Sequence, residues 1–170
     1  MILNNMREFG QEAIDAINEN EFIIFLDIDG VLVSYDNLKE RNSKDGKQVF
    51  VQEAVDALNT IISYYNASLC MISGWNANFQ GNCERYADFL KGRGIIVNKL
   101  TVGDRINRYK FVEDCIKQYP NLKYLIIDDE YFGYYDSGVI PHKRILGTNM
   151  YRCLDRYDAK WATYNFKLDI

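Results

Sequence analysis

Residues 22–30 read Phe-Ile-Ile-Phe-Leu-Asp-Ile-Asp-Gly and give the strongest indication of the fold class. An uninterrupted apolar run is typical of a strand buried on both faces, as in a parallel sheet. Asp27 and Asp29 follow directly, so we expect them at the carboxyl edge of that sheet, where open α/β folds place their ligands. Two close carboxylates repel each other unless a cation compensates them. The stretch therefore predicts a metal site, and the alternative is an acidic turn in which Gly30 supplies a positive φ.

Composition limits the class of protein. The chain has 170 residues and is 48% hydrophobic, which favours one globular domain, residues 1–170, over a disordered segment. Its net charge of −4 lacks the basic excess of a dedicated nucleic-acid-binding protein. The cysteines are widely spaced without a Cys-x-x-Cys motif, which favours reduced thiols and a cytoplasmic location. We expect no secretory signal and no membrane span.

Strands and helices are expected to alternate along the chain. Further candidate strands are the apolar stretches 67–72, 95–97, 122–127 and 143–146. Candidate helices cover 51–65, 83–91, 112–119 and 151–161, and an accessory amphipathic helix falls within 1–20. Residues 31–50 are polar and predict a flap or loop. The alternation predicts an α/β three-layer sandwich around a central, mainly parallel, Rossmann-like sheet.

Polar residues close three of these apolar strands. Asp27 and Asp29 end the first, Ser73 the second, and Asp128 with Asp129 the strand at 122–127. In a parallel sheet these ends share one edge, so we expect the carboxylates to gather there. An oxygen-rich site of this kind suits Mg²⁺, which binds a few carboxylates and completes its octahedron with water and substrate phosphate.

Other residues at the same edge suit a phosphate group. The Ser73 hydroxyl can bond a phosphate oxygen, and Gly74 permits close approach to the backbone N–H groups. A cation is expected from Arg108 or Lys110, near the start of the helix before Asp128, with Arg105 as a third choice. Lys110 and Arg108 are not separated by the sequence.

In this order, over most of the chain, these residues resemble the haloacid dehalogenase-like (HAD) superfamily. The first motif is Asp-x-Asp-Gly-Val at 27–31, and the second is an apolar strand ending in Ser73. The third is a basic residue near 108–110, and the fourth is the pair at 128–129. The resemblance implies that Asp27 is a nucleophile that forms an aspartyl-phosphate, and that Asp29 is the general acid and base.

The same resemblance implies the ligands of the metal and of the phosphate. Mg²⁺ would be held by Asp27, the backbone carbonyl of Asp29, and Asp128, with Asp129 binding directly or through water. Ser73 and the basic residue would hold the phosphoryl oxygens. Dehalogenase members lack the second aspartate, so a phosphatase is favoured over a dehalogenase.

The chain lacks room for a large cap domain, which many relatives insert after the first motif or between the second and third. Residues 31–50 fall short of an independent domain of ~50 residues, and residues 74–107 are largely used by a helix and a strand. A capless site is open, so the resemblance implies a large substrate, such as a nucleic-acid end or a protein, or a lid made by a partner. The Asp-Ile-Asp-Gly-Val-Leu and Asp-Asp-Glu runs also look like the capless subgroup of RNA-repair proteins and polynucleotide 3′-phosphatases. Those relatives often carry Trp-Arg after the second motif, whereas Trp75 is followed here by Asn76.

Three functions stay open at this point. The first is a Mg²⁺-dependent phosphatase acting on a nucleic-acid end or another large phosphoester. The second is a phosphatase for a small metabolite, and the third is a phosphate- or protein-binding module without activity. The aromatic residues of 131–135 either stack on bases or pack beneath a loop, and packing is the favoured interpretation. The sequence leaves the oligomeric state undetermined.

Overall fold

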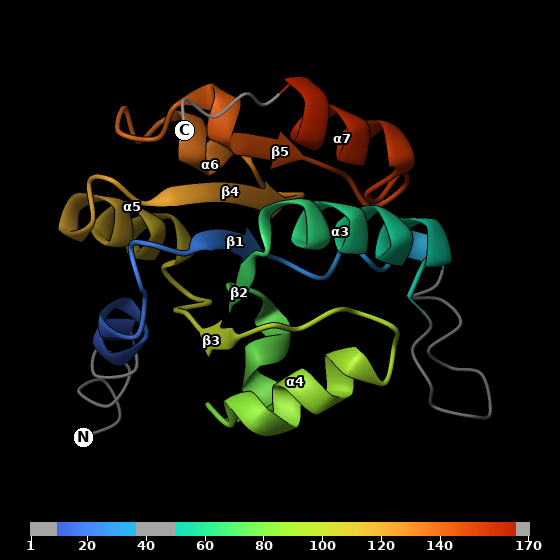
Figure 1. Ribbon diagram of the computed structural model, residues 1–170, viewed down its shortest axis with the longest axis horizontal. Helices are drawn as coiled ribbons and strands as arrows, with labels where there is room; N and C mark the ends of the chain where they lie inside the picture. Colours follow the sequence, from blue (N-terminus) through green and yellow to red (C-terminus); the bar gives the residue numbers. More distant parts are fainter. Residues whose placement is uncertain (1–9, 37–49, 166–170) are drawn as a thin grey trace.

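The computed structural model describes residues 10–36 and 50–165. Its centre is a five-stranded sheet in the order β3-β2-β1-β4-β5 (Figure 1). Every neighbouring pair of strands in it is parallel. The strands are β1 (Phe22–Leu26), β2 (Ser68–Met71), β3 (Leu100–Val102), β4 (Lys123–Asp128) and β5 (Ile145–Gly147). The predicted parallel α/β sheet is confirmed.

Helices cover both faces of this sheet. One face carries α3 (Gln52–Tyr65), α4 (Cys83–Lys91) and α7 (Arg156–Lys160), and α7 continues as the π-helix η4 (Trp161–Asn165). The other face carries a helical segment at residues 10–15, α5 (Arg108–Gln118) and α6 (Phe132–Tyr135). Two short 3-10 helices lie in connections of the chain: η2 (Gly74–Asn78) between β2 and α4, and η3 (His142–Arg144) between α6 and β5. This is the expected three-layer sandwich.

The alternation of side chains in β1 explains why both faces must be covered. Ile24 and Leu26 pack into the core beneath α3, whereas Ile23 and Phe25 pack into the core beneath α5. Every residue of β1 is buried. Successive side chains of a strand point to opposite faces, so an unbroken apolar strand requires a helical layer on each side.

The third strand lies later in the chain than predicted. Residues 95–97 are not a strand, because their backbone bonds to α3 instead of to β2. The Asn59 side chain accepts a hydrogen bond from the Ile96 N–H at 2.8 Å and donates one to the Gly94 carbonyl at 2.7 Å. The strand pairing with β2 begins at Leu100.

The segment after β1 is less polar than expected. Val31, Leu32 and Val33 are fully buried in a tight turn, in which the Ile28 carbonyl accepts hydrogen bonds from their N–H groups. Residues 37–49 of the predicted flap lie outside the described residues, as do residues 1–9 of the predicted accessory helix. Between the second and third motifs, the chain forms only η2, α4 and β3. In the described ranges, no helix has the length and apolar character needed to cross a membrane.

Candidate active site

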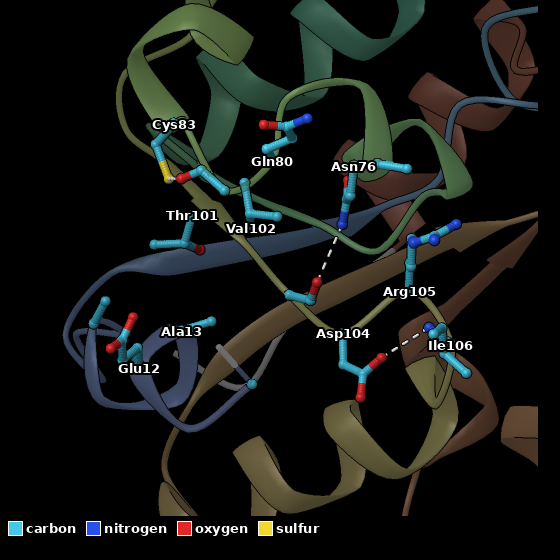
Figure 2. Close-up of a pocket in the computed structure, with 15 residues that line it drawn as sticks. Glu12, Ala13, Asn76, Gln80, Cys83, Thr101, Val102, Asp104, Arg105 and Ile106 are labelled. Atoms are coloured by element: carbon cyan, nitrogen blue, oxygen red, sulfur yellow. Dashed lines mark hydrogen bonds between the residues drawn. The ribbon is translucent and has the colours of Figure 1, made fainter. Parts of the chain in front are cut away.

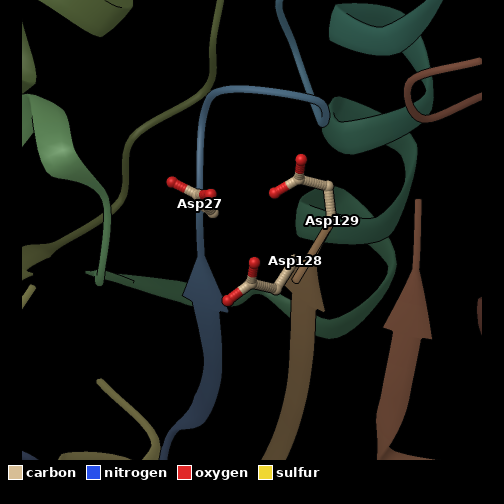
Figure 3. A group of neighbouring side chains, drawn as sticks. All are labelled: Asp27, Asp128 and Asp129. Carbon is tan, nitrogen blue, oxygen red and sulfur yellow. The ribbon is translucent and has the colours of Figure 1, made fainter. Parts of the chain in front are cut away.

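Three carboxylates meet at the carboxyl ends of β1 and β4. Asp27 directly follows β1, Asp128 is the last residue of β4, and Asp129 comes next. One carboxylate oxygen of each lies within 4.8 Å of the others. Figure 3 shows the three side chains grouped beyond the tips of the two strands. The pairing of Leu26 with Ile127 produces this arrangement, because it brings the next residue of each strand to the same level of the sheet.

Gly30 allows Asp129 to come close to the turn after β1. Its φ is +71°, a left-handed value that favours glycine. A Cβ atom at this position would lie 2.4 Å from Oδ2 of Asp129. The glycine of the first motif is therefore required both by its backbone conformation and by the neighbouring carboxylate.

Asp27 is buried and held by several donors. Its Oδ1 accepts a hydrogen bond from the Ile28 N–H at 2.8 Å, and the Ser73 hydroxyl also donates to this carboxylate. Burial, reinforced by the charge of Asp128, raises the pKa of Asp27 from 3.8 to about 7, although Arg108 opposes the rise. A cation bound here would favour the ionised carboxylate.

Arg108 is the cation that reaches this cluster. Its Nη1 lies 3.0 Å from Oδ2 of Asp27 and 3.2 Å from Oδ2 of Asp128, and its Nη2 lies 2.7 Å from Glu130. Burial lowers the pKa of Arg108, but the charges of Asp128, Asp27 and Glu130 outweigh this effect and raise it. The guanidinium therefore stays charged beside Asp27.

The other two basic candidates lie elsewhere. Lys110 pairs with Asp114 on the outer side of α5 at 2.8 Å and keeps 74% of its side chain exposed. Arg105 is exposed, and no ion pair joins it to the described acids of the cluster. Of the three candidates that the sequence offered, the geometry brings only Arg108 to Asp27.

Asp128 is tied to the helix that follows it. The Tyr134 hydroxyl donates to its Oδ2 at 2.7 Å, and the Glu130 N–H donates to its Oδ1 at 2.9 Å. Burial raises the pKa of Asp128, and Arg108 counteracts that rise. Burial and the charges of Asp128 and Glu130 raise the pKa of Asp129 to about 6. The three clustered acids thus share an environment that disfavours their joint ionisation without a cation.

The segment that begins at Ser73 holds Asp29, the other aspartate of the first motif. The Trp75 indole N–H donates to Oδ1 of Asp29 at 3.0 Å. Ser73 caps η2 by accepting the Trp75 N–H at 3.2 Å, and Gly74 is exposed with open space where a Cβ would lie. The loop therefore places a buried hydroxyl beside Asp27 and leaves the backbone of Gly74 accessible.

A cavity of about 520 Å³ opens beside this loop (Figure 2). Asn76, three residues after Ser73, lines it and donates to the Met71 and Gly103 carbonyls at 2.8 and 3.1 Å. These bonds tie η2 to the ends of β2 and β3. Arg105 and Cys83 also line this cavity, as Figure 2 shows. Arg105 thus belongs to this recess and not to the acidic cluster.

The donor set fits a hard divalent metal ion. The clustered ligand atoms of Asp27, Asp128 and Asp129 are all carboxylate oxygens, and two of the three residues are buried. Burying such charges is unfavourable unless they are paired or bound to a metal. Arg108 supplies one positive charge, whereas the three ionised carboxylates would carry three negative charges. The cluster therefore fits a divalent cation.

Three contacts at the site were not predicted. Glu130 pairs with Arg108, Tyr134 bonds Asp128 beneath the loop, and Trp75 bonds Asp29. The run of acids at 128–130 was the only available signal for Glu130. No periodicity distinguishes Tyr134 from its aromatic neighbours, although packing beneath a loop was the favoured interpretation of this group.

The comparison with known families agrees with this geometry. A family model for the HAD domain in Swiss Army Knife RNA repair proteins matches residues 23–159, which include every residue of the acidic cluster. No curated protein and no solved structure matches the chain. The family implies a phosphatase-type hydrolase and typically uses a divalent metal. Since the match spans most of the chain, the protein belongs to the family of HAD domains found in Swiss Army Knife RNA repair proteins.

Proposed function

We propose that this protein is a Mg²⁺-dependent phosphatase that removes a phosphate monoester from a nucleic-acid end through an aspartyl-phosphate on Asp27. The contact between Arg108 and Asp27 at 3.0 Å is the observation that carries the proposal. A guanidinium beside a buried carboxylate neutralises a phosphate group that approaches the same oxygen. The absence of a large cap between the second and third motifs favours an extended substrate.

In the first step, an Asp27 oxygen attacks phosphorus, and the bond between phosphorus and the leaving oxygen breaks. Asp29 donates a proton to that leaving oxygen. Trp75 holds Oδ1 of Asp29 at 3.0 Å, and no hydrogen bond among the described residues engages Oδ2. The second oxygen is therefore the one available for the proton.

In the second step, Asp29 takes a proton from water, whose oxygen attacks the phosphorus on Asp27. The bond between phosphorus and the Asp27 oxygen breaks and restores the carboxylate. Ser73 and Arg108 hold the phosphoryl oxygens in both steps and stabilise the charge that develops on them. Asp27, Asp128 and Asp129, with the Asp29 carbonyl, would hold Mg²⁺, which supplies additional charge neutralisation when bound.

Asp27→Asn tests the proposed nucleophile. An amide cannot form the acyl phosphate, so phosphate release from an aryl phosphate with Mg²⁺ should fall about 10³-fold or more. EDTA should abolish release by the unmodified protein. Asp88→Asn, at an exposed position on α4, is the matched control and should retain full activity. Activity of folded Asp27→Asn equal to that of the control would remove Asp27 from the mechanism.

A second candidate is a phosphatase for a small phosphorylated metabolite. The cavity of about 520 Å³ has the size of a small-molecule site, and its lining reaches Asn76 beside the Ser73 loop but includes neither Asp27 nor Arg108. Comparing kcat/KM for 3′-phosphorylated oligonucleotides with that for a metabolite panel distinguishes the two. Faster turnover of a metabolite than of every oligonucleotide would favour the second candidate.

A further inference from the structure

The aromatic residues after Glu130 divide into a buried and an exposed set. Tyr134 is fully buried, with its hydroxyl on Asp128. Phe132, at the start of α6, exposes 67% of its surface. A single exposed ring is common on protein surfaces, so its setting decides whether it has a function.

Phe132 rests on a ring that the sheet itself fixes. The Tyr131 and Phe132 rings stack with centroids 4.4 Å apart and planes inclined by 29°. Tyr131 lies against Gly147, where a Cβ atom would come within 2.4 Å of the Tyr131 ring. Glycine at 147 is what permits this position. The exposed ring is therefore supported from below by a ring that packs against the backbone of β5.

The support lies next to the acidic cluster. Gly147 is the direct neighbour of Asp128 in the pairing of β4 with β5, and adjacent strands are about 4.8 Å apart. The Cα atoms of Asp128 and Phe132, four residues apart, are separated by at most about 14 Å. Glu130, which contacts Arg108, stands between them in the chain. The ring pair is thus within reach of a nucleotide whose phosphate lies at Asp27.

Two further rings adjoin this pair. Tyr135 packs edge-on against Tyr131 at 5.7 Å and against Phe132 at 6.2 Å. His142 lies 4.3 Å from the Tyr135 ring. Aromatic side chains in such a series accept the faces of unpaired bases with little regard to base identity.

We propose that Phe132, backed by Tyr131, stacks on the base of the terminal nucleotide whose phosphate is removed at Asp27. The inference rests on the proposed function and names its substrate as a single-stranded end with an unpaired terminal base. Specificity then comes from the presence of a base and not from its identity. Tyr134, buried below, takes no part in the stacking.

Binding to the Asp27→Asn protein tests this without turnover. The probe is a 5′-labelled single-stranded hexanucleotide with a 3′-phosphate, compared with one whose terminal nucleotide is abasic. In Mg²⁺, Phe132→Ala should raise Kd for the intact probe about tenfold, whereas Phe132→Trp should retain affinity. Loss of the base should have a similar effect, and combining it with Phe132→Ala should add little.

Tyr64→Ala is the matched control. Tyr64 exposes 62% of its surface and packs against Tyr65. Tyr65 stacks on Phe22, the first residue of β1, at the other end of that strand from Asp27. Its removal should leave Kd unchanged. Equal affinity for intact and abasic probes, or no binding of either, would overturn the stacking proposal. Base-dependent binding by a protein whose unmodified form releases no phosphate from any substrate would instead overturn the phosphatase proposal.

Discussion

Arg108 contacts Asp27, Asp128 and Glu130, whereas Lys110 contacts only Asp114 among the described acids. Arg108→Ala should therefore lower kcat/KM for phosphate release at least about 100-fold, because a charge-assisted contact to the phosphoryl group is lost. Lys110→Ala should stay within about twofold of the unmodified protein, since an exposed ion pair contributes little. Steady-state kinetics of both variants measure the difference. Equal losses would remove Arg108 from its assigned role.

Trp75 is a positioning residue for Asp29. Trp75→Phe keeps an aromatic ring against Phe50 and Phe89 but removes the N–H that bonds Asp29. We expect kcat to fall about tenfold, in line with the loss of a hydrogen bond to a charged group. The loss should be larger for an alkyl phosphate than for an aryl phosphate, because the poorer leaving group depends more on protonation. Equal losses for both substrates would indicate a merely structural role.

At the scale of the element, the turn after β1 places one strand end against another. In Gly30→Ala, the alanine must adopt a left-handed φ of +71°, and its Cβ would lie 2.4 Å from Oδ2 of Asp129. Gly138→Ala is the matched control, because Gly138 has a φ of +64° and nothing within 4 Å of its missing Cβ. The left-handed backbone conformation alone costs about 1–2 kcal/mol in either alanine variant. We expect Gly30→Ala to lose more stability than Gly138→Ala in thermal unfolding.

The same pair of variants separates stability from metal binding. Only Gly30→Ala displaces Asp129, so only this variant should weaken Mg²⁺ binding, measured as the Mg²⁺ concentration for half-maximal activity. The expected shift is severalfold. Equal Mg²⁺ requirements in the two variants would contradict a role of Asp129 in metal binding.

At the scale of the whole molecule, the buried acids make stability depend on pH. The pKa of Asp27 rises from 3.8 to about 7 on folding, so the folded state holds a proton that the unfolded chain has lost. This contribution is complete below pH 4 and disappears as the pH rises through 7. Metal-free protein should therefore lose several degrees of Tm from this group between pH 5 and pH 8.

Mg²⁺ should reverse that loss, because it binds the deprotonated carboxylates and only the folded state. The Mg²⁺-induced rise in Tm should be larger at pH 8 than at pH 5.5. Asp27→Asn should raise the metal-free Tm at pH 8, since it removes a buried charge. Calorimetry at both pH values measures these shifts, and a Mg²⁺ effect that is greater at low pH would contradict the assignment.

Much of the architecture follows from local pattern. The apolar runs ending at Asp27, Ser73 and Asp128 identify three strands and their carboxyl ends, because a doubly covered strand needs an unbroken apolar run. The strand at Leu100 was misplaced to 95–97. That error arose because the Asn59 side chain, distant in sequence, satisfies the backbone of the more apolar segment.

From the amino-acid sequence alone it follows that acidic residues end parallel strands at one edge of the sheet, because unbroken apolar runs identify the strands and their alternation with helices makes them parallel. Which basic residue pairs with these acids depends on the tertiary structure. Arg108 and Lys110 are two residues apart on one helix and so point about 200° apart, and the packing of α5 on the sheet turns just one of them inward. The aromatic group was resolved in the same way, with Tyr134 beneath the loop and Phe132 exposed, because side-chain direction depends on contacts that lie far apart in the chain.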